Sequence, residues 1–257
     1  MRPNIPILIA KGTALEIMNI ETVENPLPPA AIEDILMQQN KIGYAPYITN
    51  LDIANALLTE STAPIIPLIM KNTKEATNTN SFRIEGTAVL KKDKLVGYLN
   101  DRETRGLEWV IGNIRLGAIV LPGIKTGSLT TLVIDSYSKI NPILKGNDIT
   151  IEIDVKNKAN IREMTDDLDM MKNPEIMDEL NEIQNKIIKT EIEEAINSAQ
   201  KNLKQDVFGF DQAIYRKYPK EWKKIKDKWS EEFPRCIVKV NVHSNIERPG
   251  SLNKSIK

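Results

Sequence analysis

A run of apolar residues at helical spacing between residues 174 and 203 constrains the fold most. Its members recur every three or four positions: Ile176, Leu180, Ile183, Ile187, Ile188, Ile192, Ala195, Ile196 and Ala199. Pro174 suits the first turn of a helix, where its missing N–H would have no partner. At ~1.5 Å per residue, a helix from Pro174 to Leu203 would be about 45 Å long. That length crosses a whole sheet, so the sequence predicts a sheet beneath this helix.

The segment ITIEIDVK, residues 149–156, alternates with a period of two. Its apolar residues face one way and its acidic residues the other, which is typical of a strand with one solvated face. Further strands are predicted over 82–90, 95–99, 114–121, 129–140 and 235–246, and shorter helices begin at Asp211 and Pro219. This order predicts an α+β domain, with a mostly antiparallel sheet packed by one long helix and shorter helices.

The region before residue 71 has a different pattern. A strand over 5–10 precedes Thr13 and Glu16, which have the spacing of a capping box. A second helix is expected near Pro29, and Thr49 with Asp52 predicts the cap of a third. A strand over 65–70 completes this region. These elements predict a partial α/β N-terminal domain.

Residues 71–81, KNTKEATNTNS, contain no large apolar side chain. Such a segment is typical of a solvated linker or a long hairpin loop. We therefore expect a domain boundary here, with an N-terminal domain over 1–71, a linker over 72–81 and a C-terminal domain over 82–257.

The composition excludes several classes of function. Thirty-five basic and 35 acidic side chains give zero net charge, so no global basic field for nucleic acid exists, and we expect no nucleic-acid partner. One cysteine, Cys236, excludes an intramolecular disulfide, and with the single His243 it makes a zinc site or a Cys–His nucleophile untenable. No apolar run approaches the ~18 residues of a membrane-spanning helix.

Three segments resemble known site motifs only superficially. GAIVLPGIKT, residues 117–126, has the wrong glycine and lysine spacing for a phosphate-binding P-loop. SYSK, residues 136–139, has the Ser-x-x-Lys spacing of penicillin-recognising enzymes but falls in a predicted strand. TDDLDMMKNPE, residues 165–175, lacks the central glycine of a calcium loop. We therefore predict no catalytic, cofactor-binding or metal-binding residue and no cofactor.

The segment KYPKEWKKIKDKW, residues 217–229, mixes lysine with aromatic residues. One interpretation is contact with an anionic membrane surface. The other is an amphipathic helix that buries Trp222, Ile225 and Trp229, with lysines on its solvated face. Neighbouring acidic residues weaken the membrane interpretation. Lys220 and Lys223 are retained as predicted protein-contact residues.

The cluster DRETRG, residues 101–106, follows a predicted hairpin. Asn100 or Asp101 is placed to cap a helix, with Glu103 in its first turn. A catalytic role for Asp101 and Glu103, for example on cell-wall material, would need a partner base and a pocket. Arg102 and Arg105 are instead predicted to lie in surface ion pairs or at a protein contact.

Three blocks carry a family resemblance in their order and spacing. They are GTAVLKKDKLVGYLNDRETRGLEW (86–109), SKINPILKGNDITIEIDV (138–155) and DVFGFDQAIYRKYPKEWKKIKDKWSEEFP (206–234). Together they resemble the C-terminal domain of the spore germination Ger(x)C family, the lipoprotein C subunits of endospore germinant receptors. RPNIPILIAKGTALEIM (2–18) and GYAPYITNLDI (43–53) resemble the later part of that family's N-terminal region.

The resemblance implies a non-enzymatic subunit of a receptor complex. The implied partners are the A and B membrane subunits, and the implied location is the outer face of the inner spore membrane. The family's signal peptide and lipid-bearing cysteine have no counterpart in this chain, so we expect it to be N-terminally truncated. The main hypothesis is a subunit that acts through protein contacts. The alternative is a sensor that binds a small-molecule germinant at the domain junction.

Overall fold

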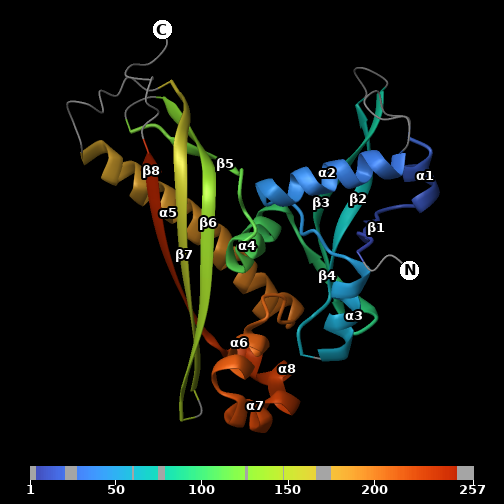
Figure 1. Ribbon diagram of the computed structural model, residues 1–257, viewed down its shortest axis with the longest axis vertical. Coiled ribbons are helices and arrows are strands. Elements are labelled where there is room, and N and C mark those ends of the chain that lie inside the picture. The colour runs from blue at the N-terminus through green and yellow to red at the C-terminus, as the bar shows by residue number, and fades with distance from the viewer. Residues whose placement is uncertain are drawn as a thin grey trace.

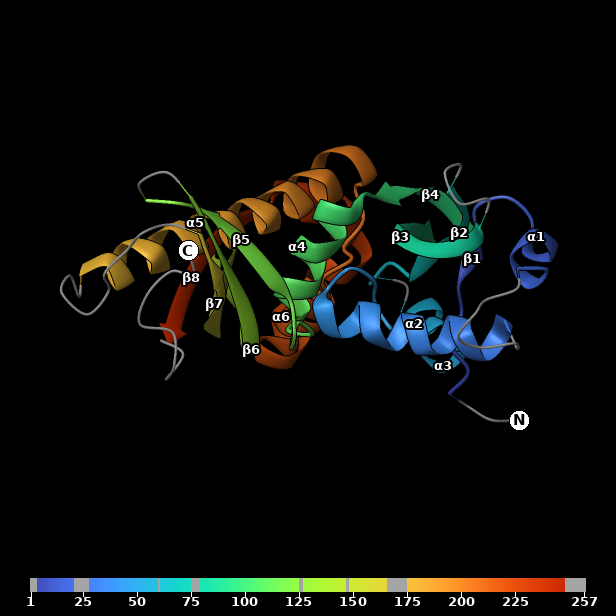
Figure 2. The same ribbon diagram turned by 90° about the horizontal axis from the view of Figure 1, so that it is seen from above.

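The computed structural model describes residues 4–20, 28–59, 61–74, 79–124, 127–146, 148–165 and 175–247. Its strands form two separate four-stranded sheets, with order β1-β2-β3-β4 and β5-β6-β7-β8. Helix α4 (Asp101–Ile111) lies between the two sheets, as Figures 1 and 2 show. The mixed helix and sheet composition confirms the predicted α+β class.

The first sheet combines a short parallel pair with a long meander. β1 (Ile9–Ala10) runs parallel to β2 (Ile65–Lys74), and β3 (Thr79–Lys91) and β4 (Lys94–Leu99) follow in antiparallel order. Helices α1 (Ala14–Met18), α2 (Pro28–Ile42) and α3 (Asn50–Thr59) accompany this sheet (Figure 1). A small core that includes Ile17, Leu36 and Ile84 joins helices to sheet.

Local capping fixes where these helices begin. Thr13 Oγ1 accepts the backbone N–H of Glu16, and the Glu16 carboxylate accepts the N–H of Thr13, which confirms the predicted capping box. The Thr49 hydroxyl accepts the N–H of Asp52 in the same way before α3. These short polar side chains replace the missing partners of first-turn N–H groups.

At its described positions, the segment predicted as a linker over residues 72–81 forms the paired strands of a hairpin. Residues 72–74 belong to β2 and residues 79–81 to β3, and Lys74 pairs with Thr79 in one hairpin. In space, the first sheet also includes β3 and β4, which lie C-terminal to the boundary expected from the sequence. The division of the chain into domains stays a prediction.

The second sheet is antiparallel except at its last strand. β5 (Ala118–Pro122), β6 (Ser128–Lys145) and β7 (Asp148–Met164) form a meander, and β8 (Ile237–Glu247) pairs in parallel with β7. The inward residues Ile151, Ile153 and Val155 are buried, as the alternation predicts. β5 begins four residues later than expected, because the N–H groups of Arg115 and Leu116 donate to the Lys41 carbonyl at the end of α2.

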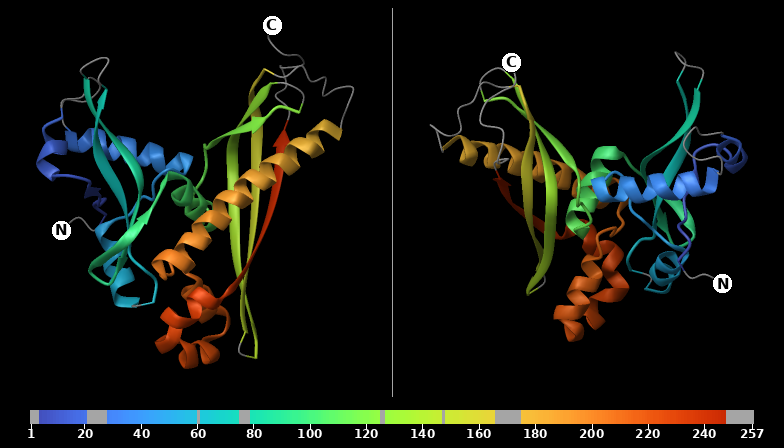
Figure 3. Two further views of the ribbon diagram at one scale, coloured as in Figure 1. Left: turned by 180° about the vertical axis from the view of Figure 1, so that it is seen from behind. Right: turned by 45° about the horizontal axis from the view of Figure 1, so that its top comes forward.

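Helix α5 (Glu175–Asn197) crosses one face of the second sheet diagonally, as Figure 3 shows. It confirms the predicted long helix, although its last turn, Ser198–Leu203, widens to a π-helix. Within the described residues, no helix is both long and apolar enough to cross a bilayer.

A compact group of short helices follows. α6 (Phe210–Lys217), α7 (Pro219–Ile225) and α8 (Trp229–Glu232) pack together, with short 3₁₀ turns at Lys226–Lys228 and Phe233–Arg235. The helix expected to begin at Pro219 is therefore interrupted. The interruption lets the Trp222 and Trp229 rings meet edge to face, with their centroids 5.4 Å apart.

Candidate functional site

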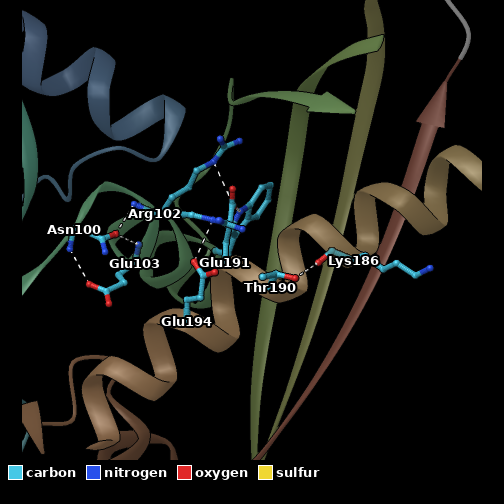
Figure 4. A network of polar contacts seen from close by, with 9 residues as sticks. Asn100, Arg102, Glu103, Lys186, Thr190, Glu191 and Glu194 are labelled. Atoms are coloured by element: carbon cyan, nitrogen blue, oxygen red, sulfur yellow. Dashed lines mark hydrogen bonds and ion pairs between the residues drawn. The ribbon is translucent and has the colours of Figure 1, made fainter. Parts of the chain in front are cut away.

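The predicted cluster at residues 101–106 forms the first turns of α4 and faces α5 (Figure 4). Asn100 caps the helix by accepting the N–H groups of Arg102 and Glu103, both at 2.9 Å. The Glu103 carboxylate accepts the Asn100 N–H at 2.8 Å in return, so Glu103 completes a capping box. This arrangement confirms the capped helix that the sequence predicts directly after the hairpin.

Arg102 lies on the solvated side of this helix pair. Its Nε is 3.1 Å from Oε2 of Glu194 on α5, and its side chain is 57% exposed. It is therefore accessible to a partner protein, and its role as a contact residue stays a prediction.

Arg105 is buried, so its prediction as a surface ion-pair or contact residue is wrong. Its Nη2 donates to the Ala118 carbonyl at 2.8 Å, and its guanidinium lies 5.5 Å from the centre of the Tyr44 ring. Its Nε is 3.6 Å from the buried Glu191 carboxylate. The guanidinium thus joins α4 to β5, to α5 and to the N-terminal region. The residues near Arg105 in the sequence do not indicate that three distant elements meet at its side chain.

A glycine permits this convergence. A Cβ on Gly106 would lie 2.0 Å from the Glu191 carbonyl oxygen, well inside van der Waals contact. Gly106 therefore lets the backbones of α4 and α5 approach closely, and the approach brings Glu191 to Arg105 and Trp109. The Trp109 indole N–H donates to Glu191 Oε2 at 2.8 Å.

Two carboxyl groups of this cluster are perturbed by burial. Burial raises the pKa of Glu191, while the Arg105 guanidinium and the Trp109 N–H act in the opposite direction. Burial raises the pKa of Glu108 to about 8, and a hydrogen bond from Asn113 offsets this in part. Glu108 Oε2 is 3.5 Å from the Asn40 amide nitrogen at the end of α2, whereas its buried Oε1 has no hydrogen-bond partner. This cluster joins parts of the chain and provides no exposed reactive group.

A second buried carboxylate cluster lies at the start of the short C-terminal helices. Asp206 Oδ1 accepts the backbone N–H groups of residues 208, 209 and 210, and its Oδ2 accepts those of Asp211 and the Trp229 indole. Burial raises the pKa of Asp206 to about 7, with the nearby Asp211 carboxyl adding to the effect and the backbone donors opposing it. Asp211 accepts the hydroxyls of Ser61 and Thr62 at 2.5 and 2.6 Å.

Beside this cluster is a cavity of about 640 Å³. Its walls come from the end of α3, the β3–β4 turn, the loop that carries Asp206, and the α7–α8 segment. Residues before β2 therefore face residues from the C-terminal helices across it. The sequence analysis missed this site, because its lining comes from four segments that are far apart in the sequence.

Lys220 and Lys223 are exposed on α7, whereas Trp222 and Trp229 are buried. The amphipathic interpretation of this segment is confirmed. The two lysines remain predicted contact residues. The sequence analysis did not single out Asp206, and it named Asp211 only as the start of a helix. Acidic residues flanked by Val207, Phe208 and Phe210 are nevertheless a signal for buried carboxylates.

Comparisons with known proteins identify the family of the chain. The domain described as "Spore germination protein N-terminal domain" matches residues 1–71, and "Spore germination B3/ GerAC like, C-terminal" matches residues 85–250. Since the second match covers more than half of the chain, the chain belongs to this spore germination family. The Ger(x)C resemblance seen in the sequence is confirmed.

Individual relatives are about a quarter identical to the chain over the aligned residues. Spore germination protein KC of Bacillus subtilis (strain 168) is 26% identical over 98% of this chain and 65% of its own length. Spore germination protein YndF of the same organism is 26% identical over 67% of this chain and 43% of its own length. The chain thus spans less than two thirds of these curated relatives.

A solved structure has the same fold. The crystal structure of the GerBC protein matches with a TM-score of 0.74 and 19% sequence identity, covering 96% of this chain and 70% of that one. At this identity the likeness shows the fold alone.

Proposed function

We propose that the chain is part of a non-enzymatic subunit of a spore germinant receptor complex and acts through protein contacts. Membership of the spore germination family over both the N-terminal and the C-terminal regions supports this role. The proposed partners are the A and B membrane subunits, at the outer face of the inner spore membrane. An anionic membrane surface beside them would suit the exposed lysines of α7.

The edge strand β4 carries the contact proposal. It ends the first sheet, so one side of its backbone has no neighbouring strand within the described part of the chain. Val96 and Tyr98, two residues apart and therefore on one face, are 40% and 50% exposed. An exposed edge with large apolar side chains is a ready surface for another chain. We assign this edge to a receptor partner.

The test is a pair of lysine substitutions, Val96→Lys and Tyr98→Lys, in the full-length protein. Both side chains are exposed, so the free energy of unfolding should change by no more than about 0.5 kcal/mol. Copurification with the A and B subunits should be lost, and nutrient-induced germination should slow. Tyr137→Lys on β6, where Tyr137 is 61% exposed, is the matched control. Normal copurification by the β4 variants would overturn the assignment.

A second function is favoured by the cavity. We propose that it binds a small-molecule germinant between residues 56–64 and the C-terminal helices. Its volume is in the usual range of small-molecule sites, and such sites favour junctions between structural units. Calorimetry with a panel of amino acids, sugars and nucleosides on this chain tests the proposal. If no compound of the panel binds, and neither pyrophosphate nor citrate binds, the proposal is wrong.

A further inference from the structure

Positive charge gathers at the cavity although the whole chain is neutral. Lys91 and Lys92 from the β3–β4 turn, Lys204 after the π-helical turn, and Lys226 before α8 all line it. Each of the four side chains is exposed. Among the described residues, none of these ammonium groups lies in an ion pair. The chain has equal numbers of acids and bases, so four unpaired lysines at one cavity are a local excess.

The acidic residues of the cavity do not cancel this excess. Asp206 is buried, and its two oxygens accept five N–H groups from its own loop and from Trp229. Both oxygens of this carboxyl group are therefore occupied by protein donors, and the group does not face a ligand. Asp227 is exposed at the rim and opposes one of the lysines. Three ammonium groups remain in excess at the rim.

Two of these lysines have an unfavourable backbone conformation. Lys92 has φ 57° and Lys204 has φ 52°, and they are the two non-glycine residues with positive φ in the described part of the chain. Glycine adopts this region without strain, whereas a lysine with a Cβ does so at a cost. Lys204 ends a helix at the position where glycine is most common. Both strained residues point to a side-chain role, because the backbone alone would favour glycine.

We propose that this cavity binds a small organic anion with at least two negative charges, carried on phosphate or carboxylate groups. This inference rests on the ligand-binding function proposed above and specifies its ligand class. Lys92 and Lys204 would hold the anionic groups from two sides, and Lys91 and Lys226 would supply the surrounding positive field. Trp222 and Trp229, which also line the cavity, provide an apolar wall for the organic part of the ligand. A soluble metabolite and the headgroup of an anionic lipid share this chemistry.

Titration calorimetry of the chain with pyrophosphate and with citrate is the first arm of the test. We expect binding that weakens as salt rises, since the lysines are exposed. Vesicles of phosphatidylcholine with and without cardiolipin, whose headgroup carries two phosphates, form the second arm. Anion binding without vesicle binding identifies a soluble ligand, and vesicle binding that requires cardiolipin identifies a headgroup. Either result supports the anion site if the variants below abolish it.

The decisive variants are Lys92→Gly and Lys204→Gly. Each relieves a strained backbone and also removes a cation. We therefore expect each to raise Tm by about 2–4 °C while weakening anion binding by about tenfold or more. A purely structural role for these lysines predicts a lower Tm instead. Lys92→Gln and Lys204→Gln remove the charge while leaving the strain, and should lose binding without the gain in Tm.

The matched control is the double variant Lys139→Gln/Lys156→Gln, which removes two exposed charges from the second sheet, away from the cavity lining. It should bind as the unaltered chain does. Undiminished binding by the Lys92 and Lys204 variants would overturn the proposal, as would the absence of binding in both arms. If only uncharged or zwitterionic germinants bind, the anion site is wrong while the sensing function stands. If no compound binds, both fail.

Discussion

Two buried polar clusters connect the N-terminal elements to the rest of the molecule, and they compensate charge in different ways. In the α4–α5 cluster, the guanidinium of Arg105 faces Glu191, while Glu108 has a neutral partner in Asn40. In the Asp206 cluster no cation among the described residues takes part, and backbone N–H groups surround the carboxylate. Each cluster also reaches the N-terminal region, through Asn40 and Tyr44 in one case and Ser61 and Thr62 in the other.

The two clusters differ in how completely their buried polar atoms are hydrogen-bonded. The cluster with the ion pair leaves Arg105 Nε and Glu108 Oε1 buried without a hydrogen bond. The Asp206 cluster, which has no formal counter-charge, leaves neither Asp206 oxygen unpaired. Directed backbone donors can therefore satisfy a buried carboxylate more completely than a side-chain cation whose geometry is imperfect. We expect the Asp206 cluster to be the more sensitive of the two to substitution.

Asp206→Ala should have the largest effect. It leaves five buried or half-buried N–H donors without an acceptor and disconnects Trp229 from the loop. The expected loss in the free energy of unfolding is on the order of 3–5 kcal/mol, measured by urea titration. Asp227→Ala, which removes an exposed carboxylate from the same cavity, should change stability by less than about 0.5 kcal/mol. Equal effects of the two variants would refute the role of the N–H cradle.

Arg105→Met should have the second-largest effect, with a loss of about 3 kcal/mol in the free energy of unfolding. The change keeps an apolar stem but leaves Glu191 buried without its cation. The double variant Arg105→Met/Glu191→Leu should regain part of the lost stability, because the uncompensated carboxylate has been removed. Strictly additive effects in this double-mutant cycle would show that the two side chains do not interact.

Glu108→Gln tests the unpaired carboxyl through its pH dependence. The folded-state pKa of about 8 lies above the ordinary 4.5, so between these values the folded chain holds a proton that the unfolded chain has released. The free energy of unfolding therefore falls as pH rises from about 5 to about 8, by about 1.4 kcal/mol per pH unit from this group. The variant lacks this component, so its free energy of unfolding should not fall in this way, and its gain over the unaltered chain should grow steadily from about pH 5 to about pH 8. Parallel pH profiles for the two proteins would contradict the assignment.

Arg102→Ala should have the smallest effect. Its ion pair with Glu194 is 57% and 40% exposed, and solvent screens such a pair. The expected loss is below about 0.5 kcal/mol and should vanish at high salt. A loss comparable with that of Arg105→Met would erase the distinction between the buried and exposed arginines of the same helix turn.

Periodicity and capping predicted the elements well. The alternation at residues 149–156, the apolar stripe of α5 and the caps at Thr13 and Asn100 are local signals, and local signals are written in neighbouring residues. The partner of the β3–β4 hairpin was not predictable in this way. A hairpin pattern defines the pairing between its own strands but not which sheet its outer edge joins.

The sites were less accessible to sequence reasoning. Arg102 and Arg105 look alike in the sequence, yet one is exposed and the other joins three elements, because only tertiary packing separates them. The lysines of the cavity come from turns more than a hundred residues apart, and each turn looks solvated by itself. A positive φ at Lys92 or Lys204 also leaves no trace in composition, since the residue that signals it, glycine, is missing.

The parallel pairing of β7 with β8 has a consequence for synthesis of the chain. β8 follows every other described element in the sequence, and it covers one edge of β7 with backbone pairs from Thr150–Ile237 to Asn160–Glu247. Until residues 237–247 emerge from the ribosome, the β6–β7 hairpin presents a bare strand edge. Completion of the second sheet must therefore wait for the synthesis of β8, and the nascent chain passes through a stage that favours chaperone capture or intermolecular strand pairing.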